Sequence, residues 1–497
     1  MSATLQLEHR VLERARLSRD PRFDGRFFVA VTSTGIYCRP VCPAPTPKSV
    51  HVRYFASAAA AAEAGFRPCL RCRPEAAPGT PAWLGTSAVV RRALRLIQQG
   101  ALDETGVEQF AARIGVGARH LHRLFVQHVG ASPSALAQTR RLQFAKRLLD
   151  ETSLPITQIA LAAGFGSLRR FNDAFQQTYE RAPRELRGRG HAGGARRAAT
   201  STGAGAADQV VLRLAYRPPY DWQHLAAFLA ARAIAGVERV DQRGYARTLM
   251  LPSGAAIIGV RPVAHANELE LSVRGAPASA LFELTQSARR VFDLSADPGL
   301  TARALRADPL LAAPVRRRPG LRIPGIWDPF ECVVRAVMGQ QISVAAARTF
   351  AARLVRRAGQ PLARPEDGLT HVFPAPAAVL AADLTDLGLT CARTATLIAA
   401  ARAFVDGTLD WNAPPDELVA ALQNVPGIGA WTAQYIALRA LGEPDAFPAA
   451  DIVLRRMAAA GRRPLSARAL ERRADGWRPW RSYAVMHLWC AASEAAI

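Results

Sequence analysis

The chain has 497 residues, a length typical of roughly three domains. It carries 64 lysine and arginine residues against 40 aspartate and glutamate residues, and this net charge of +24 indicates a polyanionic partner. The charged N-terminal residues lack the apolar core of a signal peptide, and no apolar run is long enough to span a membrane. Seven cysteines are too few for a disulfide framework in a chain of this length. We therefore expect a cytoplasmic, nucleoid-associated protein.

Four of the seven cysteines lie within residues 1–80 as two close pairs, Cys38 with Cys42 and Cys69 with Cys72. Prolines flank both pairs, which indicates that the cysteines lie on loops. Two such pairs can close a tetrahedral thiolate site for Zn(II). A purely structural zinc module is one interpretation of this spacing.

The residues around the cysteines, Asp24-Gly-Arg-Phe-Phe-Val, Ile36-Tyr-Cys38-Arg-Pro and Ala64-Gly-Phe-Arg-Pro-Cys69, resemble the N-terminal domain of the bacterial adaptive-response regulator to DNA methylation. The resemblance implies one zinc ion held by the four cysteines, and irreversible transfer of a methyl group to Cys38 from a methylphosphotriester in DNA. Zinc would keep the sulfur a thiolate near neutral pH. Methylation would lower the negative charge of the site, so DNA binding should tighten. Four arginines are placed to contact phosphates: Arg39, Arg67, Arg71 and Arg73.

Residues 86–187 are expected to be helical and contain two similar units, in which Gly115 and Phe125 recur as Gly164 and Phe175. Apolar residues at helical spacing with a glycine at the turn are typical of a helix-turn-helix. The doubled unit resembles the AraC-type DNA-binding domain, which implies promoter DNA and RNA polymerase as partners; a plain helical bundle is the alternative. Recognition helices are expected at 118–128 and 167–177. The candidate groove contacts are Arg119, His120, His122, Arg123, Arg169, Arg170 and Asn172.

Residues 188–208 are rich in glycine, alanine, serine and threonine and are expected to form a flexible linker. The regulator family often carries a second methyltransferase domain with a Pro-Cys-His-Arg acceptor. The sequence contains no such string, so we do not expect its O6-methylguanine activity.

Short β-like runs and two helices are expected in residues 209–295. Tyr216-Arg-Pro-Pro-Tyr-Asp-Trp222 and Phe228-Leu-Ala-Ala-Arg-Ala resemble the N-terminal sheet domain of the inducible 3-methyladenine DNA glycosylase II, and the resemblance continues through Val337-Met-Gly-Gln-Gln-Ile-Ser343. It implies an α+β scaffold. The strands are expected at 210–216, 244–251, 256–263 and 268–273, and the helices at 222–235 and 278–292.

A glycine-rich turn, Val425-Pro-Gly-Ile-Gly429, separates two expected helices and is followed 22 residues later by Asp451. This string resembles the helix-hairpin-helix DNA glycosylase superfamily. Gly427 and Gly429 would let the backbone turn tightly and approach a DNA phosphate. The 22-residue spacing leaves room for a helix of about 30 Å. An ordinary turn followed by a solvated aspartate is the alternative.

Excision of a flipped base develops positive charge on the sugar, and a carboxylate near C1′ stabilises it. Asp451 is the candidate, and its apolar neighbours predict partial burial. The resemblance places Trp431, Tyr435, Trp489 and Phe228 in a pocket for cationic bases and Gln341 at the position of the wedge that fills the gap. Ile452 and Cys490 stand where relatives have pocket aromatics.

Bifunctional relatives carry a Schiff-base lysine where this chain has Trp431, and residues 209–497 contain no lysine, so we expect no lyase activity. Cys332, Cys391 and Cys490 are isolated, so an iron–sulfur cluster is not expected, and the glycosylase half should need no cofactor.

These observations predict a multidomain, mainly α protein that excises alkylated bases of the 3-methyladenine and 7-methylguanine type by hydrolysis and also acts as a methyl-accepting transcriptional regulator. A lesion-sensing transcription factor whose glycosylase half binds without cleaving is the alternative. The predicted parts are a zinc α+β domain (1–80), an AraC-type double helix-turn-helix (86–187), a linker (188–208), an α+β sheet domain (209–295) and an all-α helix-hairpin-helix glycosylase domain (296–497).

Overall fold

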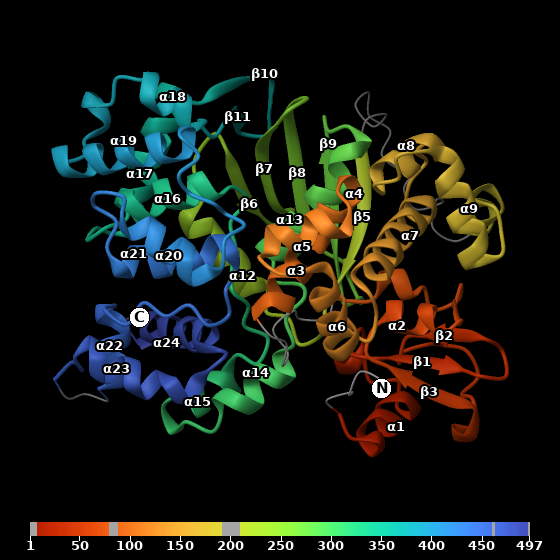
Figure 1. The fold of residues 1–497 in the computed structure, drawn as a ribbon. Coiled ribbons are helices and arrows are strands. Elements are labelled where there is room, and N and C mark those ends of the chain that lie inside the picture. Colours follow the sequence, from red (N-terminus) through yellow and green to blue (C-terminus); the bar gives the residue numbers. More distant parts are fainter. Residues whose placement is uncertain (1–6, 79–87, 191–208, 460–462, 496–497) are drawn as a thin grey trace. The chain divides into compact units, whose positions relative to one another are not determined.

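The computed structural model describes residues 7–78, 88–190, 209–459 and 463–495. The chain divides into two compact units: unit 1 comprises Met1–Pro218, Val263–Gln286 and Leu294–Ala296, and unit 2 comprises Pro219–Pro262, Ser287–Asp293 and Asp297–Ile497. Helices predominate, so the predicted multidomain, mainly α class is confirmed (Figure 1). Among the described residues, no helix combines the length and apolar character that crossing a membrane requires.

The first part of unit 1 is a four-stranded sheet with the order β3-β1-β2-β4, in which β1 is antiparallel to β2 and β3, and β2 is parallel to β4. Side chains alternate along β1, so Phe28 packs in one apolar cluster and Val29 in another. The elements are α1 (His9–Leu17), η1 (Pro21–Phe23), β1 (Phe28–Val31), β2 (Ile36–Cys38), η2 (Ser49–His51), β3 (Val52–Phe55), α2 (Ala58–Glu63), β4 (Arg67–Pro68) and η3 (Pro74–Ala76).

Two helix-turn-helix units follow, and a 19-residue helix between them contacts helices of both. Each turn has a glycine with positive φ, +86° at Gly115 and +82° at Gly164, a conformation that strains other residues. The helices after these turns match the expected recognition helices within two residues, which confirms the predicted positions of these helices. The elements are α3 (Ala88–Gln98), α4 (Ala101–Glu104), α5 (Val107–Ile114), α6 (Ala118–Val129), α7 (Pro133–Glu151), α8 (Ile156–Ala162), α9 (Leu168–Tyr179) and α10 (Pro183–Gly190).

The predicted linker begins too early, because α10 continues as a helix to Gly190. Residues 191–208 of that linker lie outside the described residues.

Unit 1 also contains part of the predicted sheet domain, since β5 (Gln209–Ala215) pairs antiparallel with β9 (Glu268–Arg274). Phe282, in the helix after η5 (Ala278–Ala280), packs edge-to-face on Phe144 of α7 at 5.0 Å. The buried Arg217 guanidinium donates to the carbonyls of Asp24 and Ser295. The boundary between the compact units therefore does not coincide with the predicted boundary at 208/209.

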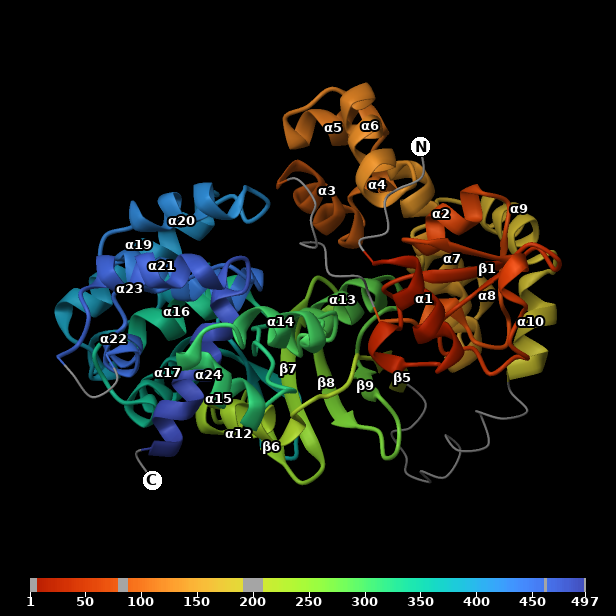
Figure 2. The same cartoon turned by 90° about the horizontal axis from the view of Figure 1, so that it is seen from below.

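In unit 2, β6 (Glu238–Asp241), β7 (Gly244–Leu251) and β8 (Gly254–Pro262) are adjacent antiparallel strands (Figure 2). The expected strands of residues 209–295 are present within two residues of their predicted ends. The sequence did not predict β6, because its residues Glu-Arg-Val-Asp are mostly charged.

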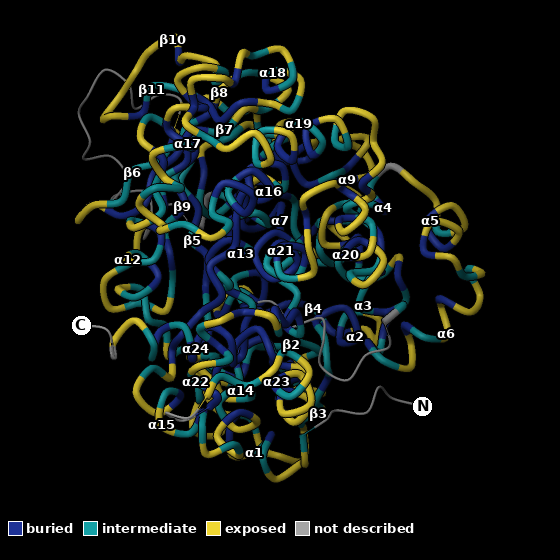
Figure 3. The backbone as a smooth tube through the Cα atoms, turned by 90° about the vertical axis from the view of Figure 1, so that its left-hand side faces the viewer, coloured by how far each residue is buried: buried dark blue, intermediate teal, exposed yellow. Residues whose placement is uncertain are grey.

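The remaining elements of unit 2 are mainly helices. α16 and one side of α17 contribute to an apolar core, and Figure 3 shows α16 mostly in the colour of buried residues. The side chains of Asp328, Ser343 and Thr390 each accept from the backbone N–H three residues further on, which caps the first turn of their helices. The elements are α12 (Trp222–Arg232), α13 (Leu281–Val291, which begins in unit 1), α14 (Pro298–Leu305), α15 (Pro309–Arg317), α16 (Pro329–Met338), α17 (Val344–Ala358), β10 (Gln360–Glu366), β11 (Leu369–Val372), α18 (Pro376–Ala381), η6 (Thr385–Leu387), α19 (Cys391–Val405), α20 (Pro415–Gln423), α21 (Ala430–Ile436), η7 (Ala437–Leu441), α22 (Ile452–Ala458), α23 (Ala467–Ala474), η8 (Asp475–Trp477) and α24 (Arg481–Ala495).

The helix after the glycine-rich turn is shorter than predicted. α21 continues as the π-helix η7 and ends at Gly442, whose φ is +63°, so the helix spans about 18 Å rather than about 30 Å. Residues 443–450 then run as a loop to Asp451.

Candidate functional site

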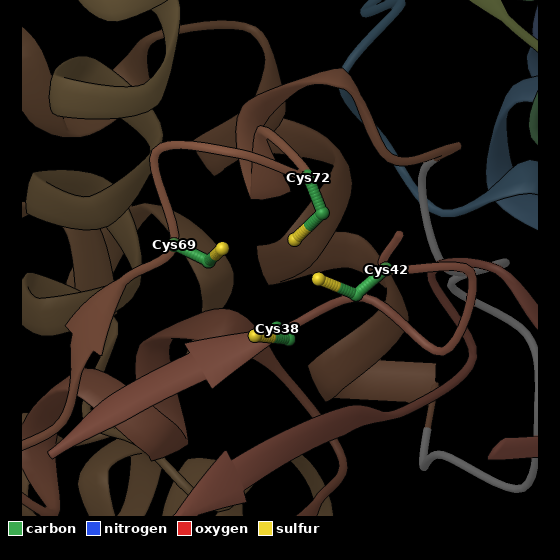
Figure 4. A group of neighbouring side chains, drawn as sticks. All are labelled: Cys38, Cys42, Cys69 and Cys72. Carbon is green, nitrogen blue, oxygen red and sulfur yellow. The ribbon is translucent and has the colours of Figure 1, made fainter. Parts of the chain in front are cut away.

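The four clustered cysteines come together in unit 1 (Figure 4). Cys38 ends β2 and Cys69 follows β4, so the parallel pairing of these two strands brings the two cysteine pairs together. All four sulfur atoms lie within 4.8 Å of one another, and no second group of three or more potential metal ligands occurs in the described part of the chain. Four thiols at these distances fit a tetrahedral zinc site.

Hydrogen bonds among the four thiols are the largest cause of the shifts in their pKa values. The pKa is lowered for Cys42, to about 7, and for Cys69, and it is raised for Cys38 and Cys72. Cys38 and Cys42 are partly exposed, whereas Cys69 and Cys72 are buried. Cys38 is therefore one of the two cysteines of the cluster that keep some contact with solvent.

Three of the arginines expected to contact phosphates are in ion pairs. Arg39 pairs with the buried carboxylate of Asp24, and its backbone N–H donates to the Cys72 sulfur at 3.3 Å. Arg67 pairs with Glu180 at 2.9 Å, and Arg73 lies 3.0 Å from Asp150 and 3.1 Å from Glu151. Arg71 is exposed. The Arg39 guanidinium also donates to the Cys72 carbonyl at 3.1 Å, so it holds the cysteine loops together, and its contact with phosphate stays a prediction.

All candidate groove contacts are exposed on the two recognition helices. Arg123 lies 3.0 Å from the His120 ring, and Arg169 is 4.0 Å from Asp173. Arg119, His120, His122 and Arg123 lie on α6, and Arg169, Arg170 and Asn172 lie on α9.

The hairpin of unit 2 requires glycine at only one of its two candidate positions. Gly427 has a φ of +86°, and a Cβ there would overlap the Thr396 side chain. Gly429 has a φ of −86°, and a Cβ there would have no neighbour within 4 Å. The first glycine forms the turn, and the second leaves open space at the start of α21.

Asp451 is the N-cap of α22 and is only 9% exposed, in agreement with its apolar neighbours. Its Oδ1 accepts from the Leu454 backbone N–H at 2.9 Å and from the Trp489 indole at 3.3 Å, and its Oδ2 accepts from the Trp431 indole at 2.9 Å. Three donors therefore fix the orientation of this carboxylate. It is not a solvated aspartate.

Two of the aromatic residues assigned to the base pocket, Trp431 and Trp489, contact Asp451, and the other two line the same cavity. Trp431 and Tyr435 stack at 5.3 Å with an interplanar angle of 11°, and Trp489 lies 6.2 Å from Tyr435. Together with Phe228 and Asp451, they line a cavity of about 710 Å³ within unit 2.

Phe228 lies against two guanidinium groups, because the Arg232 and Arg439 carbons are 3.6 Å and 4.8 Å from its ring centre. Arg439 also donates to the Tyr435 hydroxyl at 2.7 Å, and burial lowers the pKa of Arg232. The sequence reasoning missed both arginines as cavity residues, although Arg232 belongs to the quoted motif. Phe228 therefore stacks on cations of the protein itself.

Cys490 and Ile452, which stand where relatives have pocket aromatics, lie in different surroundings. Cys490 lines the cavity, its sulfur lies 3.8 Å from the His224 ring, and burial raises its pKa to about 11. Ile452 is 45% exposed and does not line that cavity.

Gln341, at the wedge position, is exposed and has a φ of +54°. Cys332 also lines the cavity, whereas Cys391 is exposed.

Four family models match the chain in an order that agrees with these sites. They are "Metal binding domain of Ada" at residues 12–75, "Helix-turn-helix domain" at 110–189, "AlkA N-terminal domain" at 211–328 and "HhH-GPD superfamily base excision DNA repair protein" at 334–481. The fold and sites thus define a DNA-binding regulator joined to a base-excision domain.

The chain is 43% identical over 482 residues, 96% of its length and 95% of the relative, to a protein of Mycobacterium tuberculosis described as "Probable bifunctional transcriptional activator/DNA repair enzyme AlkA", and it belongs to this family. It is 38% identical to "DNA-3-methyladenine glycosylase 2" of Escherichia coli, covering 56% of this chain and 95% of that one. It is 40% identical to "Bifunctional transcriptional activator/DNA repair enzyme Ada" of E. coli over 30% of this chain and 40% of that one. The 3-methyladenine DNA glycosylase of Archaeoglobus fulgidus has the same fold over 56% of this chain and 98% of that one, with a TM-score of 0.50 at 21% identity.

Proposed function

We propose that this protein repairs alkylated DNA and regulates the response to alkylation. Its C-terminal half excises alkylated bases, and its N-terminal half accepts a methyl group from the DNA backbone and binds promoters, where it acts with RNA polymerase. The observation that carries the proposal is the carboxylate of Asp451, which is held by the indoles of Trp431 and Trp489 in the wall of a cavity.

In the excision reaction, the alkylated base leaves the helix and stacks on the aromatic residues of the cavity. The bond between C1′ and the base breaks, and its electron pair leaves with the base. Asp451 stabilises the positive charge that develops on the sugar, and its effect is strengthened by burial. A water oxygen then bonds to C1′ and its proton is released. Since residues 209–497 contain no lysine, no side-chain amine is present for a lyase step, and the product is an intact abasic site.

In the methyl-transfer reaction, the Cys38 sulfur attacks the methyl carbon of a methylphosphotriester. The carbon–oxygen bond breaks, its electron pair stays on the phosphate oxygen, and S-methylcysteine and a phosphodiester result. One bound zinc ion, held by Cys38, Cys42, Cys69 and Cys72, would supply the stabilisation that keeps the sulfur nucleophilic. The partial exposure of Cys38 supports its role as the acceptor.

A base-release assay on methylated duplex DNA tests the excision activity. The wild-type protein should release 3-methyladenine, and the Asp451→Asn variant should release it far more slowly. Tight binding of alkylated DNA without release by the wild-type protein would instead support a lesion-sensing transcription factor whose C-terminal half binds but does not cleave.

A further inference from the structure

The loop that carries the wedge position joins α16 to α17 and has an unusual backbone. Gln341 in this loop has a φ of +54°, in the left-handed region that side chains other than glycine rarely adopt, and it is exposed. Such a conformation persists only where the surrounding structure holds it, and it often occurs at functional positions. The contacts of the neighbouring residue show what holds it.

Gln340 connects this loop to the hairpin. Its side-chain amide donates to the Gly427 carbonyl at 3.0 Å and to the Thr432 hydroxyl at 3.2 Å. Its backbone carbonyl accepts a hydrogen bond from the Arg393 guanidinium. The residue directly before the wedge position is therefore held at its side chain and at its main chain.

The hairpin end of this connection is also fixed. Gly427 packs so closely on Thr396 that a Cβ there would overlap its side chain, and Thr396 is only 6% exposed. Thr396 and Arg393 both belong to α19. The wedge loop, the hairpin and α19 therefore brace one another, with Gln340 in contact with the other two.

We propose that Gln340 is a positioning residue that couples the hairpin's grip on the DNA backbone to insertion of the wedge at Gln341. This inference rests on the proposed function. Unstacking a base costs free energy, and a wedge held rigidly relative to the backbone grip can apply binding energy to opening the stack. A loop released from the hairpin would still allow DNA to bind but would open the stack less often.

The test compares Gln340→Met with the wild-type full chain on two duplexes, because methionine has a similar length but cannot donate to Gly427. In one duplex the alkylated purine is paired, and in the other it lies opposite an abasic site and is already partly unstacked. The rate of single-turnover base release from the paired duplex should fall about tenfold. This factor corresponds to ~1.4 kcal/mol, which lies within the range expected for the loss of two hydrogen bonds. Release from the unpaired duplex and DNA affinity should change less than about twofold, since neither needs the wedge.

Gln360→Met, which places the same substitution on exposed β10, is the matched control and should behave as wild type. An equal loss on both duplexes would show a general structural defect and overturn the proposal, as would an unchanged rate on the paired duplex. If the wild-type protein releases no base from either duplex, the proposed function itself fails, and the inference fails with it.

Discussion

Replacing Asp451 with asparagine separates the charge of this side chain from its structural role. Asparagine is as good an N-cap as aspartate, so α22 should still begin at this position. The amide NH2 of asparagine cannot accept a hydrogen bond, so it would face one of the three N–H groups that now donate to the carboxylate. The simplest case is the Trp431 indole, which lies at 2.9 Å. A mismatch of this kind costs about 1–3 kcal/mol, so we expect a folded but less stable protein.

The catalytic effect should be larger than the structural one. A unit charge about 4 Å from the developing charge on the sugar contributes about 4 kcal/mol at an effective dielectric constant of about 20. The three hydrogen bonds delocalise part of the carboxylate's charge, so we expect base release to slow about a hundred- to a thousandfold.

Single-turnover base release from methylated duplex measures this loss, and thermal unfolding followed by tryptophan fluorescence checks the fold. Seven of the eight tryptophans lie in unit 2, so this signal reports the unit that contains the cavity. A folded Asp451→Asn protein that releases base within about tenfold of the wild-type rate would refute the electrostatic role.

Three further predictions concern other residues. Cys38→Ala should abolish methyl uptake from methylphosphotriester DNA, measured by mass spectrometry. The control Cys391→Ala, which removes an exposed cysteine outside the cluster, should still gain one methyl group. Methyl uptake by the Cys38 variant would contradict the role of Cys38 as acceptor. Trp431→Phe keeps a ring beside Tyr435 but removes the N–H donated to Asp451, so kcat should fall about tenfold with a smaller change in KM; a change in KM alone would mean that Trp431 acts only by stacking. Burial raises the pKa of Asp293 from 3.8 to about 6, so ionisation of this carboxyl destabilises the fold. As the pH rises from about 4 to about 6, the free energy of unfolding of the wild-type unit 2 should fall by on the order of 2–3 kcal/mol relative to Asp293→Asn. Unfolding curves that keep a constant difference between the two proteins would show that Asp293 does not titrate there.

Local sequence features predicted much of the fold. The glycines at 115 and 164 marked both turns of the helix-turn-helix units, and the recognition helices followed at the expected positions. The alternating apolar runs located most strands of residues 209–295, whereas the charged strand β6 gave no such signal. The length of the helix after the hairpin was overestimated, because spacing to Asp451 does not reveal that Gly442 ends the helix.

The sequence by itself determined the cysteine cluster, the doubled helix-turn-helix, the hairpin and the candidate acid, because each depends on residue types at short spacing. Only the tertiary structure decided how these groups are held: the two indoles on Asp451, the guanidinium groups on Phe228, the pairing of Arg39 with Asp24, and the connection from Gln340 to Gly427. Most of these contacts join residues far apart in the chain, and all depend on side-chain directions that are set only when helices and strands pack, which periodicity and spacing do not encode.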